Sequence, residues 1–131
     1  MKTYLGTKLV TAKSMTRPEA EVVLGRVIKP AKQNYSDDGY LVQYEDGYRS
    51  WSPKEVFEKA YKPADNFIDR MVIERDELQK RLVGLTSSLM TEGFHEKVGD
   101  KQYYWMQEQR NAMEIYVEVL NKRITDAINN K

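Results

Sequence analysis

Two long stretches in the second half of the chain repeat apolar residues at the spacing of an α-helix. The first, about residues 63 to 89, has Phe67, Met71, Leu78, Leu82, Leu85 and Leu89, and the second, about residues 100 to 128, has Met106, Met113, Val117, Leu120, Ile124 and Ala127. A recurrence every three or four residues puts such side chains on one face of a helix. The segment between them, TEGFHEKVGD, contains two glycines and ends on Asp100, a candidate helix cap. The pattern predicts two long helices packed antiparallel through a short loop.

The first half alternates apolar and polar residues and carries turn signals. LVTAK reads as a strand, Thr16 as the cap of a short helix over about residues 17 to 24, and Gly25 as its end. KQNYSDDG reads as a polar loop. Asp46-Gly47 predicts a hairpin with a two-residue turn. That register puts one set of side chains on the same sheet face: Tyr40, Val42, Tyr44, Arg49 and Trp51.

A second capping pattern, Ser52 to Glu55, predicts a short helix that ends near Tyr61. The fold class is therefore α+β: a small N-terminal antiparallel β module with short helices over residues 1–62, followed by a long two-helix hairpin over 63–131 that forms one cooperative unit. With 40% hydrophobic and 31% charged residues, the composition is typical of a folded, helix-rich chain.

Charge and residue inventory narrow the function classes. The formal net charge is +1, and neither half shows the basic excess of a DNA or RNA binder. There is no cysteine and a single histidine, His95. No apolar run approaches the ~18 residues of a membrane span, and the N-terminus lacks the apolar block of a signal peptide. We expect a cytoplasmic protein without a membrane partner.

The sequence contains few residues that could form a catalytic or metal-binding site. No nucleophile, Walker, dinucleotide or zinc-protease pattern occurs, and the carboxylate pairs Glu74/Glu77 and Glu114/Glu118 lie among Lys and Arg as on a solvated surface. His95 and Glu96 lack a third metal ligand nearby. The sequence predicts no enzyme, no metal and no cofactor.

An arginine occupies the apolar stripe of each long helix, Arg75 in the first and Arg110 in the second. A guanidinium in a helix seam needs an anionic partner. An ion pair with Glu114 or Glu77 would supply that partner. Alternatively, the aliphatic stem lies along the apolar stripe and its charged end reaches solvent. A bound phosphate is the other interpretation.

The second interpretation rests on what surrounds Arg110. The connecting loop holds Phe94 and His95 between glycines, and Tyr103, Tyr104 and Trp105 fill the first turn of the second helix. Stacking rings, free N–H groups of a helix N-terminus and an arginine are parts that bind a nucleotide. The candidate ligand-binding residues are Arg110, Phe94, His95, Tyr103, Trp105, Gln107, Arg75 and, after the first short helix, Arg26.

Apolar residues also lie off the main stripe of the second helix, namely Tyr104, Trp105, Ile115, Tyr116 and Val119. Helices of this length run about 40 Å, whereas a module of about 60 residues spans little more than about 20 Å and cannot cover them. We therefore expect a homo-oligomer, a dimer or higher; the alternative is a monomer with exposed aromatic residues.

Several stretches resemble phage proteins. NFIDRMVIERDELQKRL followed by MQEQRNAMEIYVEVLNKRI resembles small phage and prophage proteins related to ones first named in crAss-like phages. GYLVQYEDGYRSWSPKEVFEKAY resembles a module that recurs in small phage proteins, sometimes ahead of a different anti-defence domain. Together, a β-containing module and two long helices resemble the anti-Thoeris sponge family, which sequesters cyclic ADP-ribose isomers made by bacterial TIR-domain proteins.

That resemblance implies an anti-defence protein that binds a cyclised ADP-ribose signal without cleaving it. It also implies oligomers with pockets at subunit contacts, a loop that closes over the ligand, and a separate site for cyclic oligonucleotides in some relatives. Carried over residue by residue, the closing loop is Thr91 to Lys97 with Phe94 as its aromatic, and Arg110 is the arginine of the second helix. Arg26, as an N-terminal phosphate contact, matches no family motif. The host would be an infected or lysogenic bacterium.

The sequence thus predicts a sponge for a cyclic nucleotide signal as the first interpretation. The second is a protein-interaction module that docks through its helical hairpin on a host factor. A nucleic-acid binder or an enzyme would run against the charge and the residue inventory.

Overall fold

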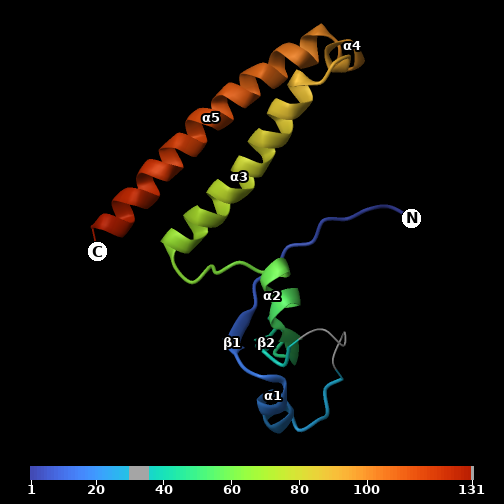
Figure 1. Ribbon diagram of the computed structural model, residues 1–131, viewed down its shortest axis with the longest axis vertical. Coiled ribbons are helices and arrows are strands. Elements are labelled where there is room, and N and C mark those ends of the chain that lie inside the picture. Colours follow the sequence, from blue (N-terminus) through green and yellow to red (C-terminus); the bar gives the residue numbers. More distant parts are fainter. Residues whose placement is uncertain (30–35, 131) are drawn as a thin grey trace. The chain divides into compact units, whose positions relative to one another are not determined.

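The computed structural model describes residues 1–29 and 36–130. The chain divides into two compact units, Met1–Lys62 and Pro63–Lys131, which are taken separately below (Figure 1). Part of the predicted polar loop KQNYSDDG lies outside the described residues. The architecture is α+β, as the sequence predicted: a small antiparallel sheet with short helices in the N-terminal unit, and long helices in the C-terminal one.

The N-terminal unit is built on a three-stranded antiparallel sheet in the order β1 (Thr11–Ser14), β2 (Gly39–Gln43) and β3 (Arg49–Pro53). Helix α1 (Arg17–Leu24) follows the first strand, and α2 (Lys54–Ala60) follows the last. The predicted limits of α1 are confirmed. The Thr16 side chain accepts a hydrogen bond from the backbone N–H of Glu19 at 3.3 Å, and Gly25 ends the helix with φ 68°.

The predicted hairpin register is wrong by one residue. The backbone N–H of Tyr44 donates to the carbonyl of Tyr48 at 2.9 Å, so the loop has three residues instead of two. Leu41 therefore pairs with Trp51, a partner that the sequence analysis gave to Val42. Gly47 adopts φ 90°, as a three-residue loop with a bulge requires. Because side chains alternate along a strand, the shift moves Trp51 to the sheet face opposite Val42.

Residues on both faces of β2 and β3 are buried, whereas all four residues of β1 are exposed. Val42 is 1% exposed on one face, where Tyr40 stacks on Phe57 of α2 with ring centroids 4.3 Å apart. Leu41 and Trp51 are buried on the other face, and the indole N–H of Trp51 donates to the carbonyl of Met15 at 2.8 Å. The burial of both faces leaves the N-terminal unit with a closed core.

The capping box predicted at Ser52 does not form. Ser52 lies within β3, and its hydroxyl donates to the carbonyl of Pro53. Pro53 occupies the cap position of α2 without a side-chain hydrogen bond. Instead, the first N–H of the helix, that of Lys54, donates to the carbonyl of Asp38 at 2.9 Å, so the chain before β2 caps α2.

The C-terminal unit contains α3 (Phe67–Met90), α4 (Phe94–Val98) and α5 (Asp100–Asn129). Helices α3 and α5 run antiparallel and side by side, with α4 at the turn between them (Figure 1). The Asn66 side chain caps α3 by accepting the N–H of Asp69 at 2.9 Å. A single seam holds the hairpin, formed by Met71, Leu78, Leu82, Leu85, Met113, Val117, Leu120 and Ile124.

Two details of the predicted hairpin differ in the structure. The connecting segment is not a loop throughout, because it contains the short helix α4. Asp100 does not cap α5 either: it is the first helical residue, and Gly99, with φ 86°, holds the cap position. The carboxylate of Asp100 is thereby free to contact α4.

Candidate functional site at the tip of the helical hairpin

Three elements meet at the tip of the hairpin, where α4 joins α3 to α5. Nε2 of His95 in α4 lies 2.7 Å from a carboxylate oxygen of Asp100. The His95 ring also stacks on Tyr103 of α5, with centroids 4.0 Å apart and planes 7° from parallel. The Tyr103 hydroxyl in turn donates to the carbonyl of Leu89 in α3 at 3.2 Å. These contacts tie α4 to both long helices.

His95 and Tyr103 therefore stack on each other, and a spacing of 4.0 Å leaves no room for a third ring between them. The sequence analysis named both residues as candidate ligand-binding residues. Only the outer faces of the pair are available for that purpose. The His95 side chain is 47% exposed, so its outer face is accessible.

Arg110 is neutralised by its own chain. Its Nη1 donates to a carboxylate oxygen of Glu114 at 2.6 Å, and its Nε donates to the hydroxyl of Thr86 on α3 at 3.1 Å. Of the interpretations that the sequence left open, the ion pair with Glu114 is what the structure contains. The position of Arg110 in the seam does not by itself require an external anion, which removes the sequence argument for a ligand there.

The ion pair of Arg110 is nevertheless accessible. The side chains of Arg110 and Glu114 are 33% and 58% exposed. Nη2 of Arg110 makes no hydrogen bond within residues 1–29 and 36–130. The guanidinium thus retains N–H donors that have no partner among the described residues.

Arg75 repeats the same arrangement elsewhere on the hairpin. Its Nε donates to Asp76 at 3.0 Å, and its Nη1 donates to Asn121 on the opposite helix at 3.1 Å. Arg75 lies eleven residues before Thr86 on α3, which is about 16 Å along the helix axis. The structure does not bring this predicted site residue to the tip. Arg75 and Arg110 serve as two equivalent cross-links of the seam.

The aromatic residues of the first turn of α5 do not converge. Trp105 follows Tyr103 by two residues, a rotation of about 200° around the helix, so their side chains leave α5 on opposite sides. Trp105 is 57% exposed and makes an edge-to-face contact with Tyr104. Gln107, four residues after Tyr103, lies on the same side as Tyr103 and is exposed.

A coherent surface remains once Trp105 and Arg75 are set aside. It consists of the outer side of the stacked ring pair, together with Gln107, Arg110, Thr86 and Met90, and is called the tip face below. Met90, the last residue of α3, is 82% exposed and lies one turn beyond Thr86 on the same side of the helix. The sequence analysis missed Thr86 and Met90. Thr86 is one of several hydroxyl residues near the loop, with Ser87, Ser88 and Thr91, so residue type alone would not have singled it out.

Two other predicted residues lie apart from this surface or at its edge. Phe94 is the first residue of α4 and is half-buried. Arg26 belongs to the N-terminal unit, where its Nη2 donates to the carbonyl of Arg49 at 3.0 Å and its guanidinium lies over the ring of Tyr48. Its predicted phosphate contact stays a prediction.

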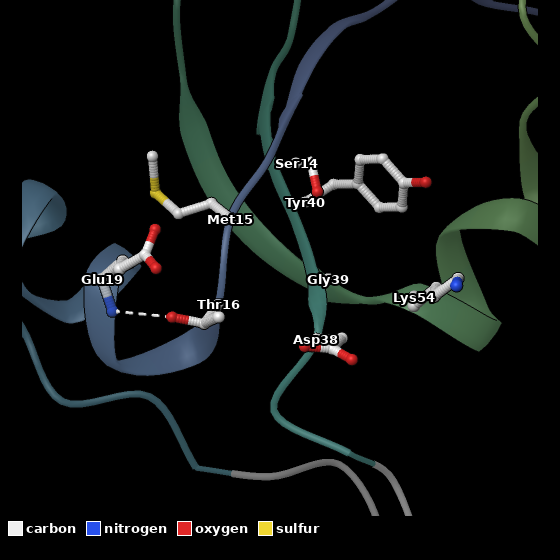
Figure 2. Close-up of a pocket in the computed structure, with 8 residues that line it drawn as sticks. All are labelled: Ser14, Met15, Thr16, Glu19, Asp38, Gly39, Tyr40 and Lys54. Atoms are coloured by element: carbon white, nitrogen blue, oxygen red, sulfur yellow. Dashed lines mark hydrogen bonds between the residues drawn. The ribbon is translucent and has the colours of Figure 1, made fainter.

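A hollow that was not predicted lies in the N-terminal unit (Figure 2). It measures about 290 Å³. Its charged lining consists of two carboxylates, Glu19 and Asp38, and one ammonium, that of Lys54. Figure 2 shows the cap hydrogen bond from the Glu19 N–H to Thr16 at its edge. Because acidic groups outnumber the lysine, this hollow is unfavourable for a phosphate.

Another hollow lies beside the C-terminal half of α5 and measures about 540 Å³. It is called the C-terminal hollow below; it is shallow and open to solvent, and the residues that line it are Glu118, Asn121, Lys122, Thr125, Asp126, Asn129 and Asn130. Neither hollow contains a residue of the tip face.

Within the described ranges, no group of three or more His, Cys, Asp or Glu side chains is arranged to hold a metal ion. None of the helices described is both long enough and apolar enough to cross a membrane.

Comparison with known proteins gives one match. Residues 65–126 match the family model described as Sequestin. The matched region comprises α3, α4 and most of α5, and it contains the whole tip face. No curated protein and no solved structure matches the chain. The predicted likeness to crAss-like phage proteins, and that of the N-terminal module, stay predictions.

Proposed function

We propose, from the premise that the helical unit of this chain belongs to the Sequestin family, that the protein binds a small nucleotide signal and withholds it without converting it. The signal we propose is a cyclic ADP-ribose isomer made by bacterial TIR-domain proteins. Capture of this signal would make the chain an immune-evasion protein of a phage or prophage. The observation that supports this function is the family match itself, since the name of the family describes sequestration.

Sequestration makes modest chemical demands. It needs contacts that hold the ligand tightly and a slow escape rate, and it needs no group that attacks or protonates the ligand. The tip face offers contacts of this kind, because it combines a cation, a hydroxyl, an amide and an aromatic surface within the matched region.

Arg110 is the phosphate-binding residue in this proposal. An exposed ion pair contributes only about 0–1 kcal/mol, so a diphosphate could displace the half-exposed Glu114 carboxylate at little cost. A guanidinium can bind two phosphate oxygens at once through two N–H groups. The Glu114 carboxylate uses only one of these groups, Nη1. The Thr86 hydroxyl, already bonded to Arg110, orients the guanidinium.

The stacked ring pair is the base-binding element. A purine would stack on the outer face of His95, whose inner face is already covered by Tyr103. Met90 supplies exposed apolar surface on α3. Both rings are held by hydrogen bonds to Asp100 and Leu89, so little side-chain entropy is lost when a ligand binds.

The test is capture and release. The protein is incubated with a panel of cyclic ADP-ribose isomers and cyclic oligonucleotides, separated from free ligand and heated, and the released molecule is identified by mass spectrometry. We expect release of an intact cyclic ADP-ribose isomer. A converted product would indicate an enzyme. The absence of any capture would favour a docking module on a host factor, for which the exposed aromatic residues of α5 would be the surface.

Arg75 provides a matched control for Arg110, because both arginines cross-link the seam through the same type of contacts. We expect Arg110→Ala to weaken ligand binding at least about tenfold, the order of one lost charge-assisted contact, and Arg75→Ala to leave it within about twofold. Equal effects of the two substitutions would show that the tip face is not the site.

A further inference from the structure

The two seam arginines differ in where their carboxylate partner comes from. Arg75 and Arg110 are thirty-five residues apart, which is five heptads, and each donates one hydrogen bond to a polar side chain of the opposite helix. The carboxylate beside Arg75 belongs to Asp76, the next residue, whereas the one beside Arg110 belongs to Glu114, one helical turn farther along α5. The cross-link of the seam therefore does not fix the position of the acidic group, and the position of Glu114 needs its own explanation.

Glu114 extends the row of tip-face residues on α5. Tyr103, Gln107, Arg110 and Glu114 follow one another at steps of four, three and four residues, so they lie along one side of the helix. Side chains of a helix tilt toward its N-terminus, and the N-terminus of α5 is the end at the tip of the hairpin. A ligand with its base on the ring pair and its phosphates on Arg110 would therefore continue toward Glu114.

The Glu114 carboxylate has capacity for a further contact. Its Oε2 accepts from Nη1 of Arg110 at 2.6 Å, and its Oε1 has no hydrogen bond among residues 1–29 and 36–130. The side chain is 58% exposed, so it can turn away from Arg110 without leaving a buried charge unpaired. An ionised carboxylate only accepts hydrogen bonds. Once phosphate oxygens occupy Nη1, the group that Glu114 can bind is a donor on the ligand.

The donors that lie closest to the phosphate of a nucleotide are the ribose hydroxyls. We propose, resting on the nucleotide-binding function above, that Glu114 is a specificity-determining residue and accepts hydrogen bonds from the hydroxyls of a ribose whose phosphate is bound by Arg110. A comparable arrangement occurs in dinucleotide-binding folds, where an acidic residue accepts from a ribose hydroxyl beside the bound phosphates. Arg110 recognises the charge of the ligand, and Glu114 recognises its ribose.

This role predicts opposite responses from two kinds of anion. Inorganic pyrophosphate has to displace Glu114 from Arg110 and offers the carboxylate no sugar hydroxyl. A ribonucleotide displaces the same carboxylate and then binds it again through its ribose hydroxyls. The class of ligand is therefore a ribonucleotide diphosphate with free ribose hydroxyls, and not a bare polyanion.

Glu114→Gln separates this role from a general electrostatic effect. The substitution removes a competing charge, so we expect the affinity of Arg110 for inorganic pyrophosphate to rise about two- to fivefold, the range of an exposed ion pair. NMR titration of the Arg110 side-chain N–H signals measures this rise. The affinity for the cyclic ADP-ribose isomer released in the capture test should instead fall severalfold, because the lost charge-assisted hydrogen bonds outweigh the removed competition. Titration calorimetry measures this fall.

Glu118→Gln is the matched control. Glu118 follows Glu114 by one turn of α5 and pairs with Lys122 at 3.3 Å beside the C-terminal hollow, outside the tip face. The two substitutions change the net charge of the chain equally. With Glu118→Gln, both affinities should change in the same direction and by less than about twofold, as expected of a screened surface charge.

The outcomes distinguish this inference from the proposed function. If Glu114→Gln raised the affinity for both probes, or left that for the cyclic ADP-ribose isomer unchanged, the ribose contact would be overturned and the sponge would stand. No response of Arg110 to pyrophosphate in either chain would also overturn the inference. Capture of no isomer by the natural chain would overturn both.

Deoxy analogues of the captured isomer give a second readout. At least one analogue that lacks a ribose hydroxyl should bind the natural chain less tightly than the parent isomer does. The same analogue and its parent should bind Glu114→Gln with similar affinity, because the partner of that hydroxyl is gone. If every analogue lost the same affinity with both chains, the hydroxyls would contact other residues and the proposal would be wrong.

Discussion

The two units use their apolar residues in opposite ways. The N-terminal unit buries Trp51 and stacks Tyr40 on Phe57, so both faces of β2 pack against residues of the same unit. The helical unit buries a single seam and leaves Tyr104 and Trp105 in solvent. A closed core stabilises a unit by itself, whereas an open helix face stabilises a unit only when something else covers it. The comparison concerns how the two cores are built, because large apolar residues are exposed on both units, among them Tyr4 and Tyr48 in the N-terminal one.

Gly39 in the N-terminal unit has no space for a side chain. A substitution there should lower the free energy of unfolding more than any other change considered. A Cβ atom at this position would lie 2.2 Å from the backbone carbonyl oxygen of Ser52 and 2.5 Å from the Trp51 ring. Because a backbone atom cannot move aside, we expect Gly39→Ala to cost more than about 3 kcal/mol and to unfold the N-terminal unit. Two-dimensional NMR of backbone amides should show loss of the β2 and β3 signals while those of α3 and α5 persist.

Gly84 in α3 is the control, since a Cβ atom there would meet nothing within 4 Å. Gly84→Ala should stabilise the helical unit by up to about 1 kcal/mol, because alanine favours a helix over glycine. The contrast between closed and open units fails if Gly39→Ala leaves the N-terminal signals intact. It also fails if the helical unit unfolds together with the sheet.

The seam is where the helical unit itself is closed, and Leu120 is its most buried residue at 1% exposed. Leu120→Ala should lower the free energy of unfolding of that unit by about 2–5 kcal/mol, through lost apolar contact and the cavity left behind. Thermal unfolding followed by circular dichroism measures this loss. Val83→Ala, at a site that is 60% exposed, should stay within about 0.5 kcal/mol. Similar losses at both sites would mean that α3 has no exposed side.

Features that depend on hydrogen bonds between neighbouring residues could be predicted from the sequence. The strand register could not, because it depends on whether the hairpin loop has two or three residues. The cap at Thr16 and the end of α1 at Gly25 follow from local hydrogen bonds and were predicted with their limits. The hairpin register was missed because it depends on the loop length. Asp46 accepts the N–H of Tyr48 at 2.9 Å, and this contact favours the three-residue loop. One residue then moved every side chain of β3 to the other face.

The candidate site shows the same division. The pairing of Arg110 with Glu114 follows from their spacing of one helical turn and was among the predicted alternatives. The stacking of His95 on Tyr103 depends on α4, which the sequence analysis took for a loop. The separation of Trp105 from Tyr103 could have been predicted from the helical rotation alone. The hollow of the N-terminal unit depends on packing between segments that are distant in the sequence, Ser14 to Glu19, Asp38 to Tyr40 and Lys54, and was not predicted.

The smallest expected effect is on the pKa values of two tyrosines. Among the described residues, each unit has one tyrosine whose pKa is shifted and whose hydroxyl contacts a carboxylate. The pKa of Tyr116 is raised from its ordinary value of 10.0, first by its hydrogen bond to Glu74 at 2.8 Å and then by burial. The pKa of Tyr40 is also raised, but burial beside α2 is the leading cause and the charge of Glu58 comes second. The pKa of Tyr116 in the helical unit is thus raised mainly by a hydrogen bond, and the pKa of Tyr40 in the N-terminal unit mainly by burial.

A raised tyrosine pKa stabilises the folded state at pH values below the ordinary pKa of 10.0, and this stabilisation is lost as the pH rises through the folded-state pKa. Glu74→Gln should return the pKa of Tyr116 toward its ordinary value, whereas Glu58→Gln should leave that of Tyr40 raised. NMR titration of the labelled tyrosine ring carbons resolves the two residues. If Glu58→Gln lowered the pKa of Tyr40 as much as Glu74→Gln lowers that of Tyr116, burial would not be the leading cause in the closed unit. The two tyrosines would then be shifted by the same kind of contact.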